Sequence, residues 1–411
     1  MPARWGTVAA YAAVAAANQL LWLTYAPITT DVARHFDVSE AAVGWLSQVF
    51  PLLYVILAIP AGLALDRRFR AALLAGAWLT AFGGAVRLGS DTFAAALAGQ
   101  IVIAIAQPLI LNAVTKVAVT SLPTRSLAQG ISLGSAGIFA GTALALPLGP
   151  LLGDAESLTP LLVVDLVVAV AAAVWLTAAM ARRGETAAAR VGAGGERAAA
   201  GGEGAAAWAG GASAPARSEA AAAGEGAAAA PAFAGRAELR RVWADRAVRR
   251  LAGVAFLGFG VFVAVTTWLQ ALLEPAGVSD ETAGWLLGAM VLAGVVGSAV
   301  LPAPLARRGK ERAFLRVAAV VAAAGCGFLA IAPGAAFLAV VPLGVVLLGS
   351  LPVILELTER RSTSSAATAL IWLAGNAGGI VVAVLVQLTQ NTPAAAFSLL
   401  AVTAALVLTV A

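Results

Sequence analysis

The stretch VSEAAVGWLSQVFPLLYVILAIPAGLALDRRFR, residues 38–70, recurs in diverged form as VSDETAGWLLGAMVLAGVVGSAVLPAPLARRGK at residues 278–310. The segments Val38-Ser39, Gly44-Trp45-Leu46 and Arg67-Arg68 all recur at one offset of 240 positions and without a gap. Each copy has a short acidic segment, then a long apolar run, then a group of arginines. Such internal repetition indicates a chain built by duplicating one module, so we expect two related halves.

The composition favours a membrane protein. Of the 411 residues, 61% are hydrophobic and 11% are charged, and the mean hydropathy is +0.91. A soluble domain has about 25% charged residues. The few charges are clustered, which leaves apolar runs of roughly 20 residues, long enough to cross a bilayer as helices. We therefore expect an all-α membrane protein.

The apolar runs predict twelve transmembrane helices in two pseudo-symmetric halves of six helices each. Residues 1–181 form the predicted N-terminal half and residues 237–411 the C-terminal half. The predicted spans are 7–33, 41–65, 71–89, 92–117, 127–150, 159–181, 249–273, 282–305, 312–331, 335–357, 364–388 and 393–411.

The basic residues predict the orientation. With twelve spans, all of the 26 Lys and Arg residues except Arg34 and Arg87 fall on the side of the membrane that carries both termini. Basic loops stay in the cytoplasm, so both termini are expected there, in a multi-pass protein of the plasma membrane. The net charge of +5 is thus a topology signal, and nucleic acid is not an expected partner. The expected partners are the lipid bilayer and a small-molecule substrate, and the chain is expected to be a monomer.

Residues 182–236 separate the two halves and consist mainly of Ala, Gly, Glu and Arg. Such a segment buries too little apolar surface to offset its chain entropy, so we expect a disordered cytoplasmic linker. The following stretch, AELRRVWADRAVRR at residues 237–250, places apolar residues among arginines. It reads either as a helix lying on the inner membrane surface or as a solvated helical leader.

The first repeat ends in the pattern G-x-x-x-D-R-x-x-R, formed by Gly62, Asp66, Arg67 and Arg70. An acid at a helix end can pair with an arginine and face the N-terminus of a neighbouring helix, such as the one beginning at residues 362–365 (STSS). The pattern resembles the signature loop of the major facilitator superfamily, and that resemblance implies a cytoplasmic latch between the halves. The second repeat has Ala306 in place of the acid. The alternative is a group of charges that only sets topology.

A second resemblance rests on NQLLWLTY at residues 18–25, GWLS at 44–47, AQPLILN at 106–112 and SLPTRSLAQGISLGSAG at 121–137. These segments look like the feline leukemia virus subgroup C receptor-related transporters, which handle choline, ethanolamine and haem. The resemblance implies a central site lined by Trp22, Gln107 and Asn376. It also implies an aromatic residue in span seven, where this chain has Val263, so that a full aromatic cage is not expected.

Other polar and aromatic residues inside the spans are further candidates for substrate binding. Asn18, Trp22 and Tyr25 share one helical face, Gln107 and Asn112 flank Pro108, and Trp372 shares a face with Asn376. Amides and indoles at membrane depth need partners or a wet cavity, and a tryptophan face can hold a cation. We favour the cavity for Trp22 and Gln107. For Asn18, Tyr25 and Trp372, helix packing is an equal alternative.

Asp165 lies about two turns inside span six. It either carries a coupling proton or pairs with a neighbouring helix. No nucleophile, phosphate-binding loop or cluster of metal ligands is evident, so we expect neither an enzyme nor a cofactor or metal site. We expect a gradient-driven or facilitative transporter of a small organic solute, such as a cationic amine or amino alcohol, that works by alternating access. The alternatives are a proton-coupled exporter that uses Asp165, or a receptor or scaffold that does not transport.

Overall fold

The computed structural model describes residues 4–200, 232–389 and 391–410, and these ranges are helical throughout apart from short connections. The first half contains α1 (Trp5–Trp22), α2 (Thr29–Phe36), α3 (Glu40–Arg67), α4 (Phe69–Leu88), α5 (Phe93–Leu111), α6 (Val114–Ser121), α7 (Leu127–Leu152) and α8 (Thr159–Ala200). The second half contains α9 (Ala232–Ala244), α10 (Arg246–Leu273), α11 (Asp280–Val300), α12 (Pro302–Arg308), α13 (Glu311–Ile331), α14 (Phe337–Glu359), α15 (Ser365–Gln387) and α16 (Pro393–Val410).

Twelve segments of the described chain are long and apolar enough to cross a membrane. They begin and end within a few residues of the predicted spans, for example Thr159–Ala181 and Glu311–Ile331. The predicted all-α fold of twelve transmembrane helices is therefore confirmed. Two predicted spans are interrupted: span one stops at Trp22 and restarts as α2, and span four stops at Leu111 and restarts as the short α6.

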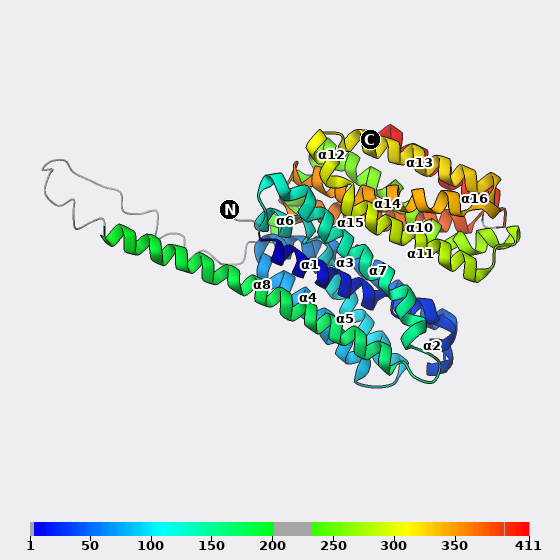
Figure 1. The fold of residues 1–411 in the computed structure, drawn as a ribbon, viewed down its shortest axis with the longest axis horizontal. Helices are drawn as coiled ribbons and strands as arrows, with labels where there is room; N and C mark the ends of the chain where they lie inside the picture. The colour runs from blue at the N-terminus through cyan, green and yellow to red at the C-terminus, as the bar shows by residue number, and fades with distance from the viewer. Residues whose placement is uncertain (1–3, 201–231, 390, 411) are drawn as a thin grey trace, which may run out of the picture.

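The two halves lie side by side as two bundles (Figure 1). They meet along α3 and α15 on one seam and along α7, α11 and α14 on another. We call the end of the molecule that carries Arg67, Lys116, Arg307 and Arg360 the basic end. Helices α6 and α12 lie at this end, and α2 lies at the opposite end (Figure 1). The antiparallel α3 and α15 bring the last turn of one against the first turn of the other at the basic end.

The two repeats begin alike and end differently. In each, a serine caps the helix: Ser39 accepts a hydrogen bond from the Ala42 N–H, and Ser279 from the Thr282 N–H. This is the usual N-cap geometry, in which a hydroxyl satisfies a free backbone donor. The first copy then continues unbroken as α3, whereas the second breaks at Leu301 and restarts as α12 with Pro302 at its first position.

The predicted linker differs from the structure at both of its ends. Helix α8 continues to Ala200, beyond the predicted end at 181, and α9 already begins at Ala232. Alanine, which dominates these segments, has the highest helix propensity of all residues. Residues 182–200 and 232–236 of the predicted linker are thus helical in the structure, whereas its middle part, 201–231, lies outside the described residues, so a disordered linker stays a prediction.

The predicted leader helix is bent at Asp245, whose side chain caps α10 by accepting from the Ala247 N–H at 2.7 Å. Val242 and Val248, on either side of the bend, are buried together with Ala367 and Leu370 of α15. Part of the apolar face that was predicted to lie on the membrane or in water thus packs inside the protein.

Candidate functional site

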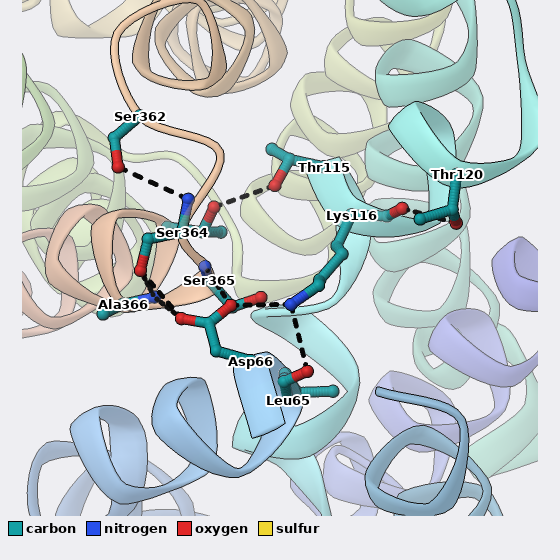
Figure 2. Close-up of polar contacts among 10 residues, drawn as sticks. Leu65, Asp66, Thr115, Lys116, Thr120, Ser362, Ser364, Ser365 and Ala366 are labelled. Atoms are coloured by element: carbon teal, nitrogen blue, oxygen red, sulfur yellow. Dashed lines mark hydrogen bonds and ion pairs between the residues drawn. The ribbon is translucent and has the colours of Figure 1, made fainter. Parts of the chain in front are cut away.

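Asp66, at the basic end of α3, bonds to both halves of the molecule (Figure 2). Within its own half, its Oδ1 lies 2.7 Å from Nζ of Lys116 on α6. From the other half, Ser364 Oγ donates to Oδ2 at 2.7 Å and the Ser365 N–H donates to Oδ1 at 2.8 Å. The Ala366 N–H adds a longer bond of 3.4 Å to Oδ2. The carboxylate therefore sits at the positive N-terminal end of α15, as the sequence predicted.

Gly62 lets the two helices come close enough for these bonds. A Cβ atom at this position would lie 3.0 Å from both the Ser365 carbonyl oxygen and the Ala369 Cβ, and 3.2 Å from the Ala366 Cα. Two of these three atoms belong to the backbone, which cannot easily yield. Glycine thus permits a close approach here that a larger residue would tighten beyond ordinary contact.

The cation that pairs with Asp66 differs from the prediction. We expected an arginine, but the partner is Lys116, which also donates to the Leu65 carbonyl at 3.1 Å. Arg67 and Arg70 are exposed, and in the described part of the chain neither bonds to Asp66. Lys116 lies on α6, one turn beyond the break in span four, and its side chain reaches Asp66 and Leu65 at the end of α3 (Figure 2).

Three further residues join this cluster. Thr115 of α6 shares a hydrogen bond of 2.9 Å with Thr368 of α15. Glu359, at the end of α14, is 5% exposed and interacts electrostatically with Lys116 and Asp66. Among the described residues, the hydrogen bonds that connect the two halves all lie in this cluster at the basic end. The molecule is therefore held closed at that end.

Asp165 has a partner that the sequence analysis did not anticipate. Its Oδ2 accepts from Arg87 Nη2 at 2.9 Å and from Thr24 Oγ1 at 2.5 Å, and both charged side chains are 0% exposed. Arg87 lies in the last turn of α4, at the end of predicted span three, and its side chain points inward rather than to solvent. Pairing offsets the cost of burying both charges. The structure thus contains the pair between neighbouring helices that was one of the two alternatives, and the coupling of a proton by Asp165 stays a prediction.

Trp22 and Gln107 face the seam between α1, α3 and α5 in the first half. The Trp22 ring stacks on Phe50 at 5.8 Å between centroids, and its Nε1 donates to the Ser47 carbonyl at 2.9 Å. Gln107 lies two turns along α5 from Gln100, which donates to carbonyls of α1 and α3 from the same face. Gln107 itself is 4% exposed and makes no side-chain hydrogen bond within the described part of the chain. Its amide is thus available to a ligand or to water.

Asn112 and Trp372 meet through a residue that sequence reasoning missed. Tyr54 of α3 donates to Asn112 Oδ1 at 2.6 Å, and its ring centre lies 6.4 Å from that of Trp372 in the other half. The Nδ2 of Asn112 donates to the Ala58 carbonyl at 2.8 Å. Asn112 thus links the end of α5 to α3 through both its Oδ1 and its Nδ2.

Trp372 also borders an apolar cavity of about 40 Å³ inside the second half, together with Phe259 and Gly375. This space is far smaller than the several hundred Å³ of a typical small-molecule site. The Trp372 indole N–H has no partner in the structure. Asn376, one turn along α15, donates to the Trp372 carbonyl at 2.8 Å. Val263, at the expected aromatic position, faces α15 and would meet a Cβ added at Gly379.

Asn18 and Tyr25 are buried within the first half. Asn18 donates to Thr80 Oγ1 at 3.1 Å and to the Ile103 carbonyl at 3.4 Å. Tyr25 lies against Arg87, whose guanidinium carbon is 5.7 Å from the ring centre. Both side chains therefore connect helices of one half, which is the packing alternative considered for them.

Of the predicted residues, the structure brings Gly62 and Asp66 together with the start of α15, and links Asn112 to Trp372. Among the described residues, no hydrogen bond or ring contact joins Trp22, Gln107 and Asn376 to one another. Sequence reasoning missed Lys116, Glu359, Tyr54 and the role of Arg87. Lys116 and Arg87 were visible as charges at the ends of predicted spans, but Tyr54 had no distinguishing signal.

We call the contact of Asp66 with Lys116 and with Ser364, Ser365 and Ala366 the latch. The two-half helical architecture and this latch at its basic end are those of a membrane transporter. A family model described as Major Facilitator Superfamily matches residues 8–409, and the chain therefore belongs to that superfamily. Its members are transporters rather than enzymes.

Relatives in sequence include proteins named as choline/ethanolamine transporters. An uncharacterised protein of Archaeoglobus fulgidus is 34% identical over 155 residues, 36% of this chain and 71% of that protein. Solute carrier family 49 member A3 of Danio rerio is 32% identical over 158 residues. The human choline/ethanolamine transporter FLVCR2 is 27% identical over 153 residues. The last two matches cover 36% of this chain but only 33% and 29% of those proteins.

Solved structures share the whole fold at low sequence identity. The human organic anion transporter MFSD10 aligns with a TM-score of 0.73 and 16% identity, covering 100% of both chains. The Escherichia coli fucose:proton symporter FucP aligns with a TM-score of 0.64 and 15% identity, covering 96% of this chain and 98% of that one. These likenesses concern the fold alone.

Proposed function

We propose that this transporter carries a small organic cation or amino alcohol of the choline type, by alternating access in the plasma membrane. The observation that carries the substrate class is the aromatic pair of Trp22 and Phe50, which stacks between α1 and α3, the helix that also packs against α15 of the other half. Aromatic faces attract cations through their quadrupole. The partial matches to proteins named choline/ethanolamine transporters support the same class.

Relative depths support a shared site for Trp22, Gln107 and Asn376. Helices α3 and α15 run antiparallel, with Tyr54 opposite Trp372. One turn further from the basic end, Phe50 on α3 and Asn376 on α15 then reach the same depth. Because Trp22 stacks on Phe50, it approaches that level from the first half. Gln107 precedes Asn112, the partner of Tyr54, and supplies a free amide near the same level.

The latch supports the transport mechanism. If the basic end faces the cytoplasm, as the arginine distribution favours, the structure corresponds to a state closed on the cytoplasmic side. Opening of this side requires Asp66 to move away from the start of α15. The hydrogen bonds that Asp66 accepts from Ser364, Ser365 and Ala366 are then replaced by hydrogen bonds to water. A solute gradient or a coupled ion then drives the cycle between the two states.

The alternative of a proton-coupled exporter depends on Asp165. The 2.9 Å pair with Arg87 supports a structural role for this acid, so we retain the facilitative or gradient-driven carrier as the proposal. A receptor or scaffold that does not transport would need no latch between its halves.

The test is uptake into proteoliposomes of labelled choline and ethanolamine, compared with an anionic solute of similar size such as lactate. We expect uptake of an amine that saturates and that competes with other quaternary or primary amino alcohols. Empty liposomes and the Trp22→Ala variant are the controls. Uptake of lactate but not of amines would contradict the substrate class, and no uptake of any solute, with amines binding normally, would favour a receptor.

A further inference from the structure

A large pocket at the basic end of the second half belongs neither to the latch nor to the seam. Its volume is about 780 Å³, and it lies between the first turns of α10 and α13 and the ends of α14 and α16. Its wall contains five arginines. We call it the arginine pocket, after Arg246, Arg250, Arg312, Arg360 and Arg361.

Most of this positive charge is not neutralised by the protein. Arg360 is paired, since Nη1 lies 2.8 Å from Glu311 Oε1 and Nη2 lies 2.6 Å from Glu356 Oε1. Within the described part of the chain, the other four arginines take part in no ion pair or side-chain hydrogen bond. The pocket therefore keeps a net positive charge even though the Glu311 carboxylate forms part of its wall.

Two helix starts add to the positive potential. Helix α13 begins at Glu311 on the wall of the pocket, and no side chain caps its first turn. Its first backbone N–H groups and its dipole therefore favour an anion nearby. Helix α10 also begins here, at Arg246, although Asp245 already caps it.

The inner wall of the same pocket is apolar. It is formed by Leu251, Val254, Leu315, Leu357 and Val410. Val254 and Leu315 also border the 40 Å³ apolar cavity that lies deeper among α10, α13, α14, α15 and α16. A free inorganic anion would gain nothing from this wall, whereas a molecule with a charged head and an apolar tail would gain from both parts.

We propose that the arginine pocket binds the phosphate headgroup of an anionic phospholipid, with the first part of an acyl chain against the apolar wall. Basic pockets between transmembrane helices at the cytoplasmic surface bind such headgroups. The guanidinium groups match phosphate oxygens in a bidentate geometry that a zwitterionic lipid with a bulky ammonium satisfies less well.

The proposal is tested by native mass spectrometry of the full chain, which is released from detergent in the instrument. The measurement compares the affinities for phosphatidylglycerol and phosphatidylcholine with identical acyl chains. We expect phosphatidylglycerol to bind more tightly. The double variant Arg250→Gln/Arg312→Gln should weaken it roughly thirtyfold, because each basic residue near an anionic lipid contributes about a fivefold change in affinity. Arg68→Gln/Arg125→Gln, with equal charge loss outside the pocket, should change the affinity less than about twofold.

Two further experiments distinguish binding of a lipid from binding of other anions. Leu251→Gln makes the apolar wall of the arginine pocket polar without changing its charge, and should weaken phosphatidylglycerol binding. Inorganic phosphate at millimolar concentration should not compete. Equal binding of the two lipids, equal loss in both double variants, or displacement by phosphate would overturn the proposal.

Discussion

At the scale of single residues, Asp66 is the group on which the closed state depends most directly. It accepts hydrogen bonds from one lysine, one serine hydroxyl and two backbone N–H groups. Bonds to a charged group contribute about 1.5–3 kcal/mol each, and no equivalent acid exists in the second repeat, where Ala306 stands at the matching position. A single carboxylate therefore carries most of the polar contact between the halves.

Asp66→Asn should weaken the latch while preserving its shape. We expect the Ser365 and Ala366 amide protons to exchange about tenfold faster, which corresponds to about 1.4 kcal/mol. Hydrogen–deuterium exchange measures this directly. Asp245→Asn is the matched control, because that acid caps α10 at the same end and should affect only the first turn of α10. Unchanged exchange at α15, with full transport, would reduce the motif to a topology signal.

The buried pair of Arg87 and Asp165 should matter for stability. Asp165→Leu leaves a buried arginine without a partner and should cost about 3–5 kcal/mol, whereas Arg87→Met/Asp165→Leu should recover most of this loss. Thermal melting in detergent is the measurement. Asp31→Asn, which breaks an exposed pair with Arg34, should change the stability by less than about 1 kcal/mol. If Asp165→Asn instead melted normally and lost only proton-dependent uptake, a coupling role would be favoured.

Trp22 tests the proposed substrate site. Trp22→Ala should weaken binding of an organic cation by about 1–2 kcal/mol, roughly five- to thirtyfold, through loss of the aromatic face. Trp22→Phe keeps an aromatic ring against Phe50 but loses the Nε1 bond to Ser47, so it should retain most of the affinity. Isothermal titration with choline provides the values. Equal affinities in all three proteins would exclude Trp22 from the site.

At the scale of helices, the two copies of the repeat have diverged where they meet the other half. Helix α3 is continuous to Arg67 and crosses α15 closely at Gly62, whereas the second copy is interrupted between α11 and α12. The duplication therefore supplies two similar scaffolds, and only the first of them carries the close crossing with its acidic residue.

Gly62→Ala should force α3 and α15 apart, because the new methyl group would meet two backbone atoms of α15. Overpacking of this kind costs about 1–3 kcal/mol. We expect faster amide exchange at the start of α15 and a bias toward the state that is open at the basic end. Gly44→Ala, on the same helix but with no atom within 4 Å, should leave exchange at α15 unchanged. Matching behaviour of the two variants would show that the crossing at Gly62 is not tight.

At the scale of the whole molecule, the sequence was sufficient to predict the fold, because membrane helices are recognisable as long apolar runs with charged ends. The contact of Asp66 with the start of α15 was also predictable, since both partners lie at helix ends whose side is known. The Arg87–Asp165 pair was not, because it joins spans three and six, and nothing local to Arg87 distinguishes a buried arginine from one in a loop. The same holds for Tyr54, whose importance depends on a neighbour in the other half.

The single cysteine of the chain, Cys326, is 0% exposed and lies within α13. Thiol reagents require both access and a thiolate, so they should not modify this residue in the folded protein. The native chain therefore offers no reactive thiol that would compete with an introduced cysteine in site-directed labelling. Spin or fluorescent labels attached to introduced cysteines on either half would report the distance between the halves during a transport cycle, without any prior change to the native chain.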